Sequence, residues 1–269
     1  MKSYKLSILS VAVGVLGSLN APAQFNYNNS DLLLGFRTPG GTSDLLVDIG
    51  SVSLYAAATS PITISGNYYT SQQLTDAGLT LNNLYFSVFG DVSPGYPTNN
   101  GPFNTLWVTR PEATPGTPSA PWAAQSSAQL ATSRSRIESI GAGGVFLGAT
   151  TAPGADNTSS AIITPDIYNQ SGDISYSVGI GSGGNFQGNF GSNNNIENNT
   201  PGSFTSGSVV SDLYEMLPNQ SGIRLGSFAL NSSGVLTFNP STVPEPATWA
   251  MLGLGMLGLT GWRRIVRKS

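Results

Sequence analysis

Carboxylates are the side chains whose types and spacing could do chemistry here, because the 269 residues include no histidine and no cysteine. Residues 24–242 also contain no lysine, so they cannot assemble a Ser-His-Asp or Ser-Lys nucleophile. Paired carboxylates suffice for glycoside cleavage when they are held about 5–10 Å apart. The pairs that the spacing offers are Asp44 with Asp48 and Asp212 with Glu215, with isolated turn or surface carboxylates as the alternative interpretation.

Calcium and sugars are the ligands that the remaining side chains favour. Calcium binds carboxylate and carbonyl oxygens, which Asp156, Asn157 and Asp166 could supply. No Asp-x-Asp-x-Asp-Gly loop occurs, however, and we predict no cofactor. Aromatic rings can stack on pyranose faces, or they can pack in a core or anchor loops. The rings in question belong to Trp107, Trp122, Tyr68, Tyr69 and Tyr96.

The segment 179–184 matches the G-x-G-x-x-G pattern of dinucleotide-binding loops. That pattern binds a pyrophosphate where a helix opens directly after it. Residues 185–195 are rich in Asn and Gly and cannot supply that helix. We therefore predict no nucleotide site.

The charge of residues 24–242 excludes nucleic acid as an expected partner. This region has five arginines against thirteen acidic residues, a net charge of −8, whereas phosphate backbones are bound by basic surfaces. Much of the remainder is Gly, Asn, Ser and Thr. Such a polar, nearly uncharged surface suits a hydrated polysaccharide matrix, and it is equally typical of plain low-complexity loops.

The first 23 residues predict a secretory signal peptide. Two lysines precede the apolar run 6–19, and Ala21 and Ala23 flank a proline in a small-x-small cleavage site. The mature protein then begins at Gln24. A retained N-terminal anchor is the alternative.

The last 27 residues contain three successive parts. The first is an extended strip in which prolines prevent helix formation, Val243, Pro244, Glu245 and Pro246. The second is the apolar stretch 247–262, and the third is the basic tail 263–269. The basic residues of that tail are Arg263, Arg264, Arg267 and Lys268.

The apolar stretch 247–262 predicts a transmembrane helix that barely spans the membrane. Its length as a helix is about 24 Å, against about 30 Å for the hydrocarbon core of a bilayer. Bilayer thinning, or the addition of Ile265 and Val266, would let it cross. The positive-inside rule then keeps the basic tail in the cytoplasm and the N-terminal bulk outside. A buried core helix is the alternative interpretation.

In this order, the three parts resemble the C-terminal sorting domain of bacterial PEP-CTERM proteins. The resemblance implies that an exosortase-type membrane enzyme recognises the tail. It further implies export across the inner membrane, at least transient anchoring, and then residence in the cell envelope or extracellular matrix. Because cargo of this family is commonly tied to exopolysaccharide, that polymer is a further expected partner. The resemblance implies nothing about what residues 24–242 bind.

Residues 24–242 predict one all-β domain, a sandwich or jelly roll with one internal helix. Short apolar runs bounded by Gly and Pro indicate the strands. We expect a hairpin of 31–37 with 45–49, a central strand 84–89 beside 105–109, and a closing hairpin of 224–231 with 235–238. We also expect strands at 51–55, 61–64 and 174–180, and a strand or short helix at 208–217.

The internal helix is predicted at 122–140, which lacks Gly and Pro and has apolar residues at loosely helical spacing. The glycines of 141–144 would end it. Its charged residues, Arg134, Arg136 and Glu138, would form a solvated face. Residues 71–82 predict a helical turn or a loop, with Ser71 as a candidate N-cap.

From these observations we expect an exported, non-catalytic protein of the envelope or exopolysaccharide matrix, sorted through its C-terminal tail. The alternative is a carbohydrate-binding or carboxylate-dependent glycan-active module.

Overall fold

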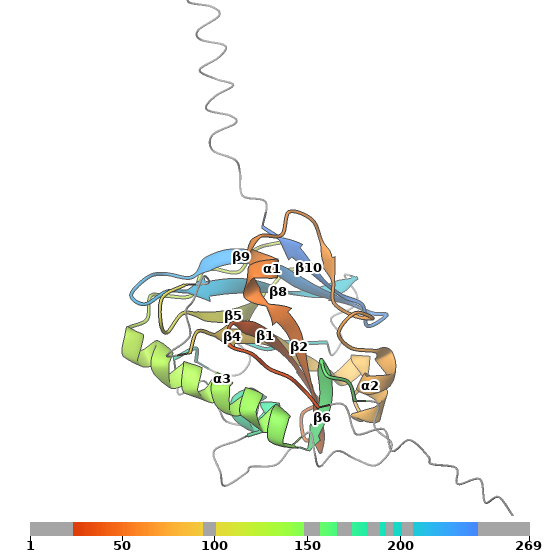
Figure 1. The fold of residues 1–269 in the computed structure, drawn as a ribbon. Helices are drawn as coiled ribbons and strands as arrows, with labels where there is room; N and C mark the ends of the chain where they lie inside the picture. The colour runs from red at the N-terminus through yellow and green to blue at the C-terminus, as the bar shows by residue number, and fades with distance from the viewer. Residues whose placement is uncertain are drawn as a thin grey trace, which may run out of the picture.

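The computed structural model describes residues 24–93, 101–147, 157–165, 174–181, 189–191, 196–200 and 207–241. Within them, ten strands form one antiparallel sheet in the order β3-β10-β9-β8-β5-β4-β1-β2-β6, with β7 paired to β4 (Figure 1). The strands are β1 (Asp31–Arg37), β2 (Ser43–Ser51), β3 (Ile62–Thr63), β4 (Tyr85–Asp91), β5 (Leu106–Pro111), β6 (Ala161–Pro165), β7 (Asn198–Asn199), β8 (Ser208–Met216), β9 (Ile223–Asn231) and β10 (Leu236–Pro240).

The sheet curls, so that its inner face encloses an apolar core. Tyr69 connects strands that are far apart in the sheet order: its ring centroid lies 5.1 Å from that of Phe36 on β1, and its hydroxyl donates to the carbonyl of Gly234 in the β9–β10 turn at 3.3 Å. The helices α1 (Val52–Ala56) and α2 (Ser71–Asp76) contribute to this core, for example through Tyr55 and Leu74. Burial of apolar area in this core is the main source of stability.

The outer face of the sheet is covered by the long helix α3 (Ser127–Leu147), drawn in green in Figure 1. Its Leu130, Ile137 and Ile140 share a second buried cluster with residues of β1, β2, β4, β5, β6 and β8. A capping box fixes the start of the helix, because Ser126 Oγ accepts from Gln129 N at 3.3 Å and Gln129 Oε1 accepts from Ser126 N at 3.0 Å. The sheet is therefore covered by apolar residues on both faces.

The predicted end of this helix is wrong, because α3 continues through the glycines of 141–144 to Leu147. These glycines let the helix approach its neighbours closely. A Cβ added at Gly141 would lie 2.3 Å from the Tyr27 ring, and one at Gly143 would lie 2.3 Å from the carbonyl oxygen of Ile174. The predicted start at 122 is also wrong, since residues 122–126 are not helical.

The β-rich domain with one long internal helix is confirmed. The β1–β2 and β9–β10 hairpins and the pairing of β4 with β5 are confirmed as well. As expected, β4 is central: Phe86 and Val88 belong to the inner core and Phe89 to the outer cluster. A sandwich or jelly roll would divide the strands between two sheets, whereas here hydrogen bonds join them into one. The undecided segment 208–217 is strand β8.

Two segments predicted as strands are helical. In the segment 51–55, Ser51 ends β2 and caps α1, which begins at Val52, and the Tyr55 hydroxyl donates to the Ile49 carbonyl at 2.6 Å. Residues 174–180 contain a π-helical turn, Ser177–Gly181, which is held where the Asp44 carboxylate accepts from the Ser177 amide and hydroxyl at 2.7 and 2.5 Å.

A 3₁₀ turn, Leu81–Asn83, precedes β4, and the predicted helical turn at 71–82 is α2. Its N-cap is Thr70 rather than Ser71. Thr70 and Gln73 form a capping box in which each side chain accepts from the other residue's amide. This capping box sets the start of the helix one residue earlier than the sequence indicated.

Candidate functional site

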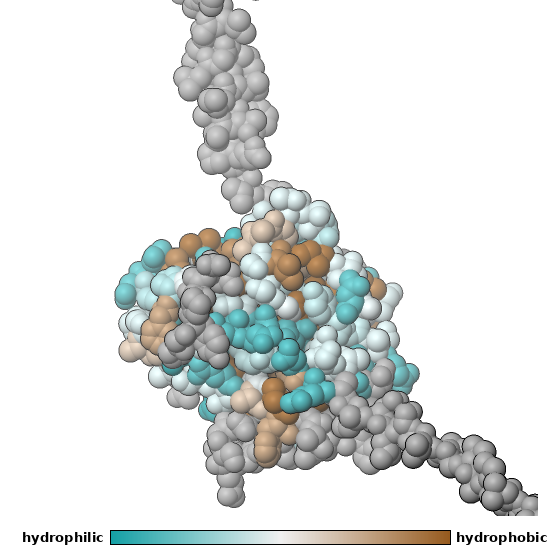
Figure 2. Space-filling model, viewed as in Figure 1, coloured by the Kyte–Doolittle hydropathy of each residue, from teal (hydrophilic) through white to brown (hydrophobic). Residues whose placement is uncertain are grey.

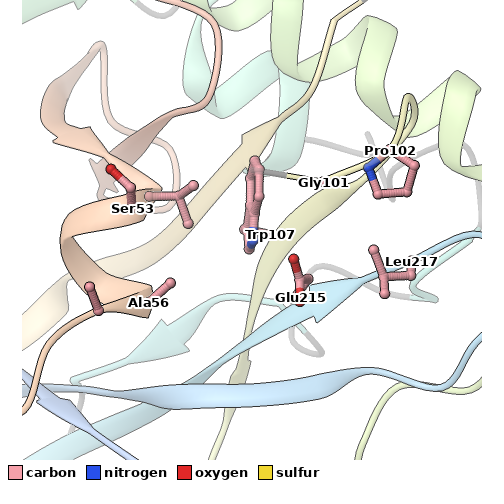
Figure 3. A pocket seen from close by; sticks show the side chains of 9 residues that line it. Ser53, Ala56, Gly101, Pro102, Trp107, Glu215 and Leu217 are labelled. Atoms are coloured by element: carbon pink, nitrogen blue, oxygen red, sulfur yellow. The ribbon is translucent and has the colours of Figure 1, made fainter. Parts of the chain in front are cut away.

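The pairing of β5 with β8 places Trp107 directly opposite Glu215. Both side chains line a pocket of about 520 Å³ between α1 and the Gly101-Pro102 turn (Figure 3). The remaining lining residues are Val52, Ser53, Ala56, Ala57 and Leu217. The pocket is therefore lined by one aromatic residue and one carboxylate that were candidates for different sites in the sequence analysis.

Helix α1 forms the second wall of the pocket. Tyr55 packs into the core, whereas Val52 and Ala56 line the pocket. The Ser53 hydroxyl points away from Trp107 and Glu215 (Figure 3) and lies 3.0 Å from the Ser51 hydroxyl. Apolar atoms also gather near this helix on the outer surface (Figure 2), where Leu54 is 52% exposed. Because the sequence around α1 predicted a strand, its contribution to a pocket was missed.

Glu215 has no ion-pair or hydrogen-bond partner within the described part of the chain. Partial burial raises the pKa of its carboxyl above the ordinary value, and no neighbouring charge contributes to that shift. Four described arginines have other partners. Arg37 pairs with Glu197, Arg224 pairs with Asp212 and Arg134 pairs with Glu138. Arg110 donates to the carbonyls of residues 120 and 121. The pocket therefore contains an uncompensated, half-buried acid.

The candidate carboxylates Asp212 and Glu215 do not come together as a pair. Side chains alternate along β8, so that residues three apart point to opposite faces. Asp212 lies on the face of Tyr214, accepting from the Ser119 amide at 2.6 Å and hydroxyl at 2.8 Å and from Arg224 Nε at 2.6 Å. Glu215 instead lines the pocket with Trp107.

The candidate carboxylates Asp44 and Asp48 do not form a pair either. Both lie on one face of β2, but four residues of strand separate them by about 13 Å, beyond the range for glycoside cleavage. Asp44 is fully buried and bound to Ser177. Asp48 faces Asp31 instead, and burial together with that neighbouring carboxyl raises the pKa of Asp48 to about 7, against the hydrogen bond from the Gly50 amide.

The structure brings two carboxyls together at a place that the sequence patterns did not indicate. Ser93 Oγ lies 2.8 Å from Asp91 Oδ2 and 2.7 Å from Glu138 Oε1, and Tyr27 donates to Asp91 Oδ1 at 2.9 Å. Because the Ser93 hydroxyl has one proton, it can donate to only one of the two carboxyls, so that the other must be protonated to bond. Burial, with a smaller contribution from Glu138, raises the pKa of Asp91 to about 6.

A buried ion pair connects β1 to the segment before β7. Arg37 donates to both oxygens of Glu197, at 2.8 and 2.6 Å, and Tyr176 donates to Glu197 at 2.7 Å. Ser87 completes the network with a 2.9 Å bond to the Tyr176 hydroxyl. This is a structural network, because Glu197 and Tyr176 are buried in the packed interior.

The aromatic residues considered for sugar stacking do not gather at one site, and Trp107 itself is a buried core residue. Trp122 packs against Phe190, with ring centroids 5.0 Å apart, and Arg110 lies over its ring at 4.5 Å. Tyr69 is a core residue, and Tyr68 packs on the edge of the same core. Tyr96 lies outside the described residues. The solvated face predicted for α3 is only in part exposed, since the side chain of Arg134 is 12% exposed and lies over Phe103.

The calcium candidates receive no support from the described residues. Asn157 Oδ1 accepts from the Ile163 amide at 2.9 Å, which uses its oxygen within the fold. Asp156 and Asp166 lie outside the described residues. Among the residues that the structure describes, no three acidic groups gather in a way that could hold a metal ion.

The glycine pattern at 179–184 does not follow a strand. Gly179 belongs to the π-helical turn, and a Cβ there would lie 2.4 Å from the Ile140 side chain. It is therefore a packing glycine, and residues 182–184 lie outside the described part.

The comparison with protein families finds the PEP-CTERM protein-sorting motif at residues 242–267. The predicted resemblance of the tail is confirmed, and the motif implies an exported protein that an exosortase processes after transient anchoring in the membrane. Searches of curated proteins and of solved structures find no significant match.

Both predicted targeting segments fall on residues that are not described. Signal residues Ala21 and Ala23, the strip 243–246, the apolar stretch 247–262 and the basic tail are all among them. Within the described ranges, no helix combines the length and apolar character needed to cross a bilayer. The signal peptide and the transmembrane helix stay predictions.

Proposed function

We propose that this protein is a non-catalytic component of the cell envelope or exopolysaccharide matrix, delivered there by exosortase processing of its tail. The observation that carries the proposal is the sorting motif at residues 242–267. The described domain ends at Ser241, whose amide donates to the Leu225 carbonyl at 2.9 Å, so the motif follows the last strand directly.

The composition of the tail favours temporary retention followed by cleavage. A helix of residues 247–262 would be about 24 Å long and would span a bilayer of about 30 Å only with thinning. The prolines of 243–246 disfavour a helix, which would keep this strip accessible to an enzyme just outside the bilayer. By the positive-inside rule, Arg263 and Arg264 would hold the other end at the cytoplasmic side.

Deletion of Pro244-Glu245-Pro246 tests this proposal. Cells that express the wild-type chain should release a shortened product, whereas the deletion should leave the full-length chain in the membrane fraction. The matched control is Ser232→Ala, which alters an exposed residue of the β9–β10 turn outside the motif. Identical processing of all three chains would contradict sorting through the strip.

A carbohydrate-binding module is the second candidate function, and one observation favours it: Glu215 lines a pocket of about 520 Å³. The catalytic form of this alternative has less support, because Asp212 and Glu215 point to opposite faces of β8. Turnover of a polysaccharide by the purified protein, abolished by Glu215→Gln, would overturn the non-catalytic assignment.

A further inference from the structure

We propose that the Ser93 hydroxyl fastens helix α3 to the end of β4 only while the Asp91 carboxyl carries a proton. The link from Ser93 to the Glu138 carboxylate is then closed at acidic pH and opens when Asp91 loses its proton. This inference goes beyond the proposed function and does not depend on it.

The groups involved come from three separate parts of the chain. Asp91 is the last residue of β4, Ser93 follows two residues later, and Glu138 lies on α3. The Ser93 hydroxyl oxygen lies 2.8 Å from Asp91 Oδ2 and 2.7 Å from Glu138 Oε1. Tyr27, from the segment before β1, donates to Asp91 Oδ1 at 2.9 Å. One hydroxyl therefore bridges the sheet and the helix that covers it.

A single carboxyl proton gives each of these contacts a donor. The Ser93 hydroxyl has one proton to donate, whereas an ionised carboxylate can only accept. When Asp91 is protonated, its Oδ2 donates to the Ser93 oxygen, and Ser93 in turn donates to Glu138. Tyr27 donates to the other oxygen of Asp91 in the same arrangement. Both short distances to the Ser93 oxygen are then hydrogen bonds.

Asp91 is the carboxyl that holds the proton at acidic pH. It is fully buried, whereas the side chain of Glu138 is 35% exposed. Burial is the main cause that raises the pKa of Asp91 to about 6, with a smaller contribution from the charge of Glu138.

The neighbouring elements contribute one cation to this cluster. On α3, Arg134 Nε lies 3.6 Å from Glu138 Oε1. The charge of Arg134 lowers the pKa of Asp91, as do the hydrogen bonds of Asp91, but burial raises it by more. At the start of β1, Asp31 places a further carboxyl near Tyr27. Loss of the Asp91 proton therefore leaves more negative than positive charge in the cluster.

Ionised Asp91 takes the Ser93 hydrogen bond away from Glu138. A fully buried carboxylate loses more from an unmade hydrogen bond than a carboxylate that water can reach. The Ser93 hydroxyl then turns to Asp91, and its oxygen faces the Glu138 carboxylate with no proton between them. Glu138 can bond to water and to Arg134 instead, so the link between α3 and the end of β4 is lost at this point.

A double-mutant cycle of Ser93→Ala and Glu138→Ala, measured by urea unfolding of the detergent-solubilised full chain, tests the proposal. At pH 5 the two residues should be favourably coupled by roughly 3- to 10-fold in the unfolding equilibrium constant, as for a partly exposed hydrogen bond to a charged group. At pH 8 the favourable coupling should be absent. The midpoint of its loss should lie near the pKa of Asp91, about 6.

Asp91→Asn separates this proposal from a pH-independent link. The asparagine amide can donate to Ser93 at every pH, as the protonated carboxyl does, so the coupling should persist at pH 8 in this background. The matched control pair is Ser135→Ala with Glu138→Ala. Ser135 lies on the same helix and donates to the Ala131 carbonyl at 3.1 Å, so this pair should show no coupling at either pH.

Equal coupling at pH 5 and pH 8, or coupling at neither pH, would overturn the proposal. A loss of coupling at pH 8 that Asp91→Asn does not reverse would assign the titration to another group, which overturns it as well. The midpoint is measured without this variant, so the proposal stays testable if Asp91→Asn does not fold. Processing of the tail plays no part in these measurements.

Discussion

Gly143 of α3 lies against the backbone of Ile174 so closely that a Cβ on Gly143 would be 2.3 Å from the Ile174 carbonyl oxygen. No real Cβ approaches an oxygen to that distance, so the helix and the segment that contains Ile174 would have to separate. The glycine is therefore required by packing, in the middle of a helix where glycine is otherwise unfavourable.

Replacing Gly143 with alanine should destabilise the domain by about 1–3 kcal/mol through overpacking. Helix propensity alone predicts the opposite, a gain of about 0.5–1 kcal/mol. Denaturant unfolding measures the difference. The matched variant is Ala142→Gly, because Ala142 is exposed on the same turn and should lose only the propensity amount. A Gly143→Ala variant more stable than the wild type would disprove the contact.

The strands were predictable because alternation of apolar residues identifies them locally. Leu84, Phe86 and Val88 do face one core and Phe89 the other, as their spacing indicated. The residues against which a glycine packs are distant in the sequence, so local patterns do not reveal them. The glycines of 141–144 were therefore interpreted as a helix end, whereas they form the contact surface of a longer helix.

The residue types at the site could be predicted from the sequence, but their arrangement in space could not. The two-residue period of a strand already places Asp212 and Glu215 on opposite faces, and this signal could have excluded the pair. The contact of Trp107 with Glu215 depends on the pairing of β5 with β8, which spacing along the chain does not reveal. Helix α1 was not predicted, because its apolar residues Val52 and Leu54 suit a strand equally well.

Asp91→Asn should remove part of the pH dependence of stability. The pKa of Asp91 is about 6 in the folded chain, above its unfolded value of about 4. Its contribution is therefore fully present below about pH 4 and is lost as the pH rises through 6. The loss is of the order of 2–3 kcal/mol, because one pKa unit corresponds to about 1.4 kcal/mol.

Chemical unfolding between pH 4 and 8 measures this effect. Asparagine can still accept from Tyr27 and donate to Ser93, so the variant should fold and have a flatter profile. An unchanged slope would show that Asp91 does not titrate in this interval.

Asp48→Asn should weaken the pH dependence of stability in a slightly higher pH range. The pKa of Asp48 is about 7 in the folded chain, raised by burial and by Asp31. The stabilising protonated form is therefore lost as the pH rises from about 4 through 7. The asparagine side chain of the variant could donate to Asp31 at every pH and still accept from the Gly50 amide. Thermal unfolding at pH 5 and pH 8 should differ less in the variant than in the wild type, and an equal difference would show that Asp48 does not titrate in this interval.

Arg37→Met should destabilise the domain by about 3–5 kcal/mol, because it leaves the buried Glu197 without its counter-charge. Adding Glu197→Gln should recover part of that loss, since the uncompensated charge is then removed. A double-mutant cycle measured by urea unfolding gives the coupling between the two residues. Additive effects of the two substitutions would show that the ion pair contributes nothing to the fold.

The most direct test of the whole account is the intact mass of the protein recovered from the extracellular matrix and from the membrane fraction. We expect a chain that begins at Gln24 and ends in or just after the strip 243–246, without the apolar stretch and the basic tail. A chain that still carries residues 247–269 and stays in the membrane fraction would contradict export followed by processing.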